Sequence, residues 1–166
     1  MAYTSKSSKL GYSENIITDI KDKFDIDVSQ DILESAINTL TEEQHNTLRL
    51  YYVEQMTYSQ AAQILGITSG MATACINSRI TKALDIIAKY ARHNGTRSIY
   101  AAFAMNNPSK YNALHNALIS GGFKSIDDLS GMKYSELLKI HSIGVKQLET
   151  IVNRCREYGV PLVADV

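Results

Sequence analysis

Residues 57–70 constrain the fold of this chain more than any other segment, because they contain two helix starts separated by one tight turn. Thr57 is a hydroxyl residue of the kind that caps a helix, and apolar residues follow it at helical spacing. Gly66 stands where a helix can end in the left-handed conformation, and a second helical pattern begins soon after it. The spacing predicts two helices that pack closely across Ala61, with Ile67 in the core beneath the turn.

Helical spacing of apolar residues extends over most of the rest of the chain. Ser13 and Ser29 precede two such patterns, and Thr41 and Gln44 have the spacing of a capping box that opens a helix to about Gln55. No segment alternates at period two for long enough to predict a strand. The fold is therefore expected to be all-α.

Composition excludes several classes of protein. Basic and acidic residues both number 17, which argues against a generic polyanion binder. Residues 30–55 nevertheless carry a net negative charge, and the chain after them carries a net positive charge. No apolar stretch approaches the roughly 18 residues of a membrane span, and residues 1–9 lack a signal peptide's apolar core. Cys75 and Cys155 are expected to be reduced thiols, so a cytoplasmic location follows.

No catalytic or metal-binding pattern stands out. The four histidines are dispersed and none has a cysteine at ligand spacing, so no metal is expected. There is no phosphate-binding loop, dinucleotide fingerprint or nucleophile elbow. We expect a protein that is not an enzyme and needs no cofactor.

With its flanks, the two-helix segment resembles region 4 of bacterial sigma factors and related phage regulators, over about residues 31–90. The resemblance rests on LTEEQ at 40–44, LRLYY at 48–52 and MTYSQAAQILGI at 56–67. It implies a helix-turn-helix whose second helix enters the major groove of DNA while the first rests on phosphates. The residues expected to contact DNA are Thr57, Tyr58, Ser69, Thr73, Asn77, Arg79 and Lys82.

A second tight corner lies at residues 138–151, where Ile143 and Gly144 separate two helical patterns in the manner of a helix-hairpin-helix. Gly144 is expected to supply backbone freedom at the corner, and the amides that open the next helix, with Lys146 beside them, would face a phosphate. The predicted DNA contacts of this module are Asn116, Ser142, Gly144, Lys146 and Gln147.

Residues 110–162 are similar to the C-terminal domain of the RNA polymerase alpha subunit. The matching pieces are NAL at 116–118, IDDL at 126–129, LLKI at 137–140, IGVKQL at 143–148 and YGVPL at 158–162. The resemblance implies a clamp on the minor groove or the DNA backbone. Ala113 stands where that family has its groove-reading arginine.

Four segments are expected from these patterns. They are an N-terminal tail and short helix at 1–28, a helix-turn-helix domain at 29–95, a connecting helix or linker at 96–109 and a helix-hairpin-helix domain at 110–166. The break before the last domain is set by Pro108.

Two hypotheses of function follow, and a third carries little weight. The first is a sequence-specific regulator of transcription, of phage or mobile-element type, that binds double-stranded DNA and could do so as a homodimer. The second is a factor that binds RNA polymerase and acts mainly through protein contacts. The third, a DNA-processing enzyme, has no catalytic constellation behind it.

Overall fold

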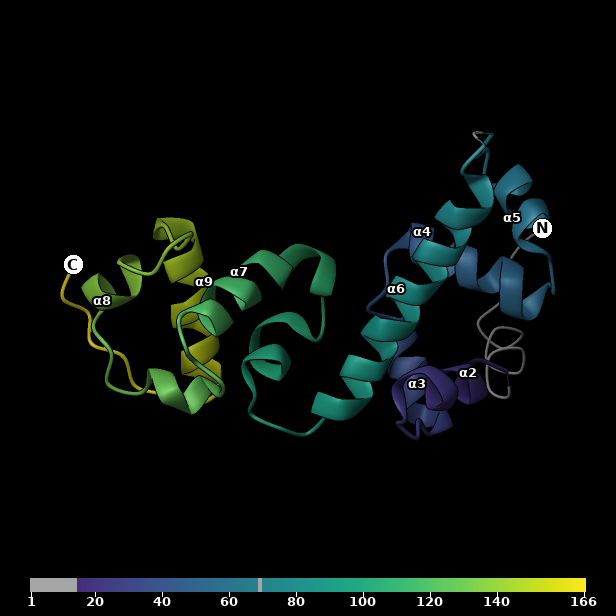
Figure 1. Ribbon diagram of the computed structural model, residues 1–166. Helices are drawn as coiled ribbons and strands as arrows, with labels where there is room; N and C mark the ends of the chain where they lie inside the picture. The colour runs from purple at the N-terminus through teal and green to yellow at the C-terminus, as the bar shows by residue number, and fades with distance from the viewer. Residues whose placement is uncertain (1–14, 69) are drawn as a thin grey trace. The chain divides into compact units, whose positions relative to one another are not determined.

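The computed structural model describes residues 15–68 and 70–166, and it divides into two compact units, Met1–Arg92 and His93–Val166. Figure 1 shows coiled ribbons in both units. Within the described residues there is no strand, only two isolated bridges, so the all-α prediction is confirmed. Two predicted features, the cap at Ser13 and the contact at Ser69, lie outside the described residues.

Over its described residues, the first unit packs six helical elements around one apolar core. They are α2 (Asn15–Phe24), α3 (Gln30–Ile37), α4 (Glu42–Leu48), the π-helix η1 (Arg49–Val53), α5 (Tyr58–Ile64) and α6 (Ala72–His93). Fully buried side chains come from every part of it, among them Ile16, Leu33, Leu48, Ile76 and Leu84. Figure 1 shows α5 beside the N-terminal part of α6.

The helix starts follow the sequence closely. The Ser29 hydroxyl accepts the amide of Ile32, and Thr41 with Gln44 forms the predicted capping box. Each such cap stabilises its helix by about 1 kcal/mol. The helix after Thr41 differs from prediction because α4 ends at Leu48 and the chain continues as a π-turn, in which the Glu54 amide donates to the Arg49 carbonyl at 3.0 Å.

The second unit contains η2 (Tyr100–Ala104), α7 (Pro108–Ser120), the 3₁₀ turn η3 (Ile126–Leu129), α8 (Tyr134–Leu138) and α9 (Val145–Glu157). Its core includes Ile99 and Phe103, which are 0% and 2% exposed. Both belong to the segment predicted as a connection, residues 96–109. In the structure this segment supplies part of the second core, because the π-turn η2 directs Phe103 inward.

Arg97 ties three parts of the second unit together. Its guanidinium donates to both carboxylate oxygens of Asp127 at 2.8 Å and to the carbonyl of Tyr158 at 2.9 Å. This bidentate geometry is the strong form of an arginine–carboxylate pair. The Ile126 amide also donates to the Arg97 carbonyl, so the chain before η2 is held against η3.

These contacts predict that the second unit loses stability in acid. Hydrogen bonding to Arg97 lowers the pKa of Asp127, backbone amides lower the pKa of Asp128, and Ser135 lowers the pKa of Asp165, all from an ordinary value of 3.8. A carboxyl whose pKa is lower in the folded state stabilises the fold above its ordinary pKa. That contribution disappears as the pH falls below it and through the folded pKa.

The variant Asp127→Asn tests this directly. At neutral pH it should unfold at lower urea concentration than the wild type, and the gap should close as the pH is lowered below 3.8. Urea titrations followed by circular dichroism, with hydrogen exchange of α9 to localise the change, measure the gap. A gap of constant size across the acid range would contradict the assignment.

Candidate nucleic-acid interface

The corner between α5 and α6 has the geometry of a helix-turn-helix. Gly66 takes the left-handed conformation, with φ 75°, as its position predicts. The Ile67 amide donates to the Ala62 carbonyl at 2.9 Å, which closes the turn, and the Ile67 side chain packs against the core. Ala61 is 0% exposed, so a larger side chain there would force α5 away from its neighbours.

The start of α5 is fixed by Thr57. Its hydroxyl accepts the Gln60 amide at 3.2 Å, and the Gln60 side chain accepts the Thr57 amide at 2.9 Å. This reciprocal capping box leaves Thr57 exposed at the helix N-terminus. The predicted contact at Thr57 therefore lies at the surface, and its hydroxyl has a local structural role as well.

Tyr58 and Asn77 lie together, one on each helix of the motif. The Tyr58 hydroxyl donates to the Asn77 side-chain oxygen at 3.2 Å. The Tyr58 ring is half-buried against the ring of Tyr51, with centroids 5.1 Å apart. Asn77 itself is exposed on α6, so both predicted contacts belong to one surface.

The N-terminal half of α6 presents a polar surface. Three residues predicted to contact DNA, Thr73, Asn77 and Lys82, are exposed, while Ile76 and Ile80 on the other side are buried. Two further exposed residues, Ser78 and Thr81, share this surface and were missed. The signal for them was their spacing from Asn77 on the polar side of the helix.

Arg79 is placed differently from the other predicted contacts. Its guanidinium forms an ion pair with Glu43 of α4 and is only 27% exposed. The positive charge of Arg79, predicted to contact DNA, is paired with a carboxylate of the same unit. The geometry gives Arg79 the role of joining α4 to α6.

The second corner lies between α8 and α9, and its backbone corrects the predicted role of Gly144. Gly144 has φ −103° and ψ −169°, an extended conformation open to any residue. The left-handed residue is Ser142, with φ 72°. Ile143 is buried at 5% exposure and anchors the turn as expected, and the Gly144 amide donates to the Gln147 side chain at 3.1 Å. A Cβ atom at position 144 would lie 3.2 Å from Gln147 Oε1, so the missing side chain leaves space for the Gln147 cap rather than relieving backbone strain.

A hollow of about 390 Å³ lies between α7 and this hairpin, lined by Ala113, Asn116, Ala117, Ser120, Gly121, Ile140, His141 and Ser142. Two of the predicted contacts, Asn116 and Ser142, therefore face the same space. Lys146 is exposed on the first turn of α9. None of the residues that line the hollow is acidic.

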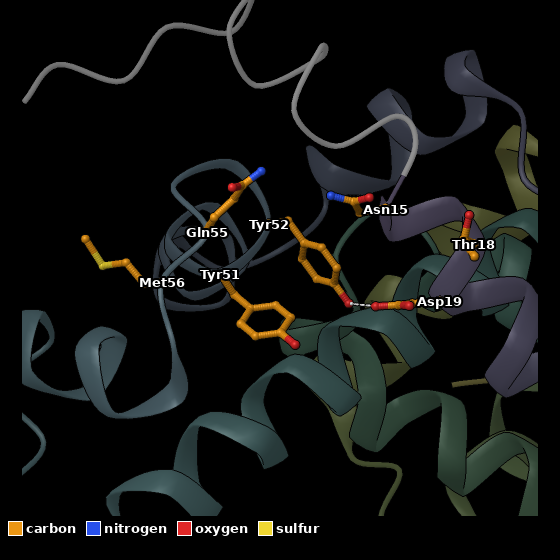
Figure 2. Close-up of a pocket in the computed structure, with 7 residues that line it drawn as sticks. All are labelled: Asn15, Thr18, Asp19, Tyr51, Tyr52, Gln55 and Met56. Atoms are coloured by element: carbon orange, nitrogen blue, oxygen red, sulfur yellow. Dashed lines mark hydrogen bonds between the residues drawn. The ribbon is translucent and has the colours of Figure 1, made fainter.

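A second hollow, of about 400 Å³, lies in the first unit at the junction of α2 and η1 (Figure 2). The buried Tyr52 hydroxyl points at Asp19 there and donates to it at 2.6 Å. Burial, with this carboxylate, raises the pKa of Tyr52 far above its ordinary value, so the hydroxyl keeps its proton. The contact joins α2 to the segment that carries Tyr51.

One cysteine lies in each unit. Burial raises the pKa of the Cys155 thiol to about 11, so this cysteine stays protonated, and both cysteines are free, as predicted. In residues 15–68 and 70–166 no group of three histidine, cysteine or carboxylate side chains is placed to hold a metal ion. No helix of this part of the chain is long and apolar enough to cross a membrane.

Comparison with known proteins supports the assignment of a helix-turn-helix in the first unit. Searches of curated proteins and of solved structures gave no match to the chain. Residues 30–84 match the family model of sigma-70, region 4, which spans α3 to the middle of α6 and indicates a DNA-binding helix-turn-helix with a role in transcription.

Proposed function

We propose that this protein is a sequence-specific DNA-binding regulator of transcription, of phage or mobile-element type. The observation that carries the proposal is the exposed polar surface of α6, presented by a closed helix-turn-helix within the segment that matches sigma region 4. In this class of motif the second helix lies in the major groove. Thr73, Asn77 and Lys82 are the residues that would meet the DNA.

The hairpin of the second unit would act as a clamp on the DNA backbone. Asn116 and Ser142 face one hollow, and Lys146 supplies charge beside the N-terminus of α9. Such contacts position a protein on DNA and carry little sequence information. When one of two linked modules binds DNA, it raises the effective concentration of the other. The whole chain therefore binds DNA more tightly than either module alone.

A second candidate function is an RNA polymerase-binding factor that acts mainly through protein contacts. The ion pair between Arg79 and Glu43 favours it, because α6 keeps few cations for phosphates. The two candidates differ in DNA affinity. Fluorescence anisotropy of the full chain with a random-sequence duplex at low salt should show binding under the first, and no binding at micromolar protein under the second.

The salt dependence of that binding tests the clamp. If Lys146 meets a phosphate, Lys146→Ala should make the slope of log K against log salt shallower by about 0.9. Lys23→Ala is the matched control, because Lys23 is exposed on α2 in the other unit. Equal slopes for the wild type and both variants would show that Lys146 does not contact a phosphate.

A further inference from the structure

The proposal concerns the surface shared by Tyr58 and Asn77, and it rests on the proposed binding of DNA by α6. We propose that Tyr58 is a positioning residue that turns the carbonyl of the Asn77 amide away from the bases. The NH₂ group of Asn77 then faces the groove, and the protein selects guanine rather than adenine at the position that Asn77 reads.

The hydrogen bond between the two residues fixes the amide. The Tyr58 hydroxyl donates to Asn77 Oδ1 at 3.2 Å, so this oxygen points toward α5. An exposed asparagine is ordinarily free to rotate about its last side-chain bond. Here one end of its amide is tied to the neighbouring helix, and the other end, Nδ2, remains for an outside partner.

The Tyr58 ring packs against other aromatic side chains of the first unit. Its ring lies 5.1 Å from the Tyr51 ring, which makes an edge contact of 4.9 Å with Tyr52. Tyr52 in turn donates to Asp19 of α2 at 2.6 Å. Partial burial, with Tyr51 close by, raises the pKa of Tyr58, so its hydroxyl remains a donor at neutral pH.

The hydrogen-bonding groups of the bases make this orientation of the Asn77 amide favour guanine over adenine. An asparagine that reads adenine must present its oxygen to the N6 amino group and its NH₂ to N7 at the same time. With Oδ1 turned toward Tyr58, that paired contact is lost and the adenine amino group would face the Asn77 NH₂ group. Guanine offers acceptors at both O6 and N7, which one NH₂ group can satisfy.

Selection from a random-sequence duplex library tests the proposal with the full chain. The position read by Asn77 is the one whose preference disappears in Asn77→Ala. There the wild type should select guanine, and Tyr58→Phe, which keeps the ring but removes the hydroxyl, should shift the preference toward adenine by about tenfold. Tyr90→Phe, a half-buried tyrosine elsewhere on α6, should leave it unchanged.

Four results would overturn the proposal, and they separate its failure from failure of the proposed function. Adenine selected by the wild type, or an unchanged motif in Tyr58→Phe, would reject the role of Tyr58 while sequence-specific binding stands. No enriched sequence with the wild type would reject both. Nuclear magnetic resonance of the free protein gives a test without DNA: the side-chain amide signals of Asn77 should move in Tyr58→Phe, and unmoved signals would reject the hydrogen bond.

Discussion

Replacing Phe103 with alanine should destabilise the second unit by about 3–5 kcal/mol, a cost typical of removing a fully buried aromatic ring. Phe103 is 2% exposed and lies in the core formed by η2, α7 and α9. Single domains have only about 5–15 kcal/mol of stability, so the loss would leave this small unit close to unfolding. Urea titration gives the free energy of unfolding, and hydrogen exchange of α9 shows whether the second unit opens.

A matched substitution separates this effect from a general cost of truncation. Ile119→Ala removes a large apolar side chain that is 45% exposed on α7, and it should cost less than about 1 kcal/mol. Equal and small losses for the two variants would mean that residues 96–109 connect the units without contributing to a core. The comparison therefore also tests where the second unit begins.

Local chemistry made the helix starts and the first corner predictable. The caps at Ser29, Thr41 and Thr57 use hydrogen bonds within three residues, and the left-handed Gly66 is a property of one position. Interactions of this kind depend only on residues that are close together in the sequence. They are sufficient to predict the position of the helix-turn-helix from the sequence.

The π-turns could not be predicted in the same way. A π-turn inserts one residue into a helix, and apolar residues on both sides of the insertion still fit a helical pattern. The sequence 49–53 therefore looked like the continuation of a helix, and YAAFA at 100–104 looked like a short connecting one. Only packing decides that Phe103 faces a core.

The surface of α6 shows a second limit to what can be predicted from the sequence. Arg79 has the charge and the position of a DNA contact, but whether it is available depends on Glu43, which lies far away in sequence and on another helix. The bond from Tyr58 to Asn77 has the same long-range origin. Position on a helix could be predicted from spacing, whereas the partner of each polar group required the packed structure.

The largest effect on function is expected from Ser78→Glu. Ser78 is exposed on α6 between Asn77 and the paired Arg79, so a carboxylate there would face the phosphates and base edges of the groove. Like charges brought together at an interface cost several kcal/mol. The affinity for DNA should fall by at least about a hundredfold, measured by anisotropy at low salt.

Folding should not account for that loss. Glutamate is a better helix former than serine, and a glutamate at 78 stands four residues before Lys82, where the pair supports the helix while cancelling a positive charge of the surface. Ser35→Glu on α3 is the control, since it makes the same change at another exposed helical position. Its DNA affinity should stay within a few-fold of the wild type because net charge alone acts weakly at a distance. Equal losses in both variants would trace the effect to net charge, and no loss in Ser78→Glu would show that α6 does not enter the groove.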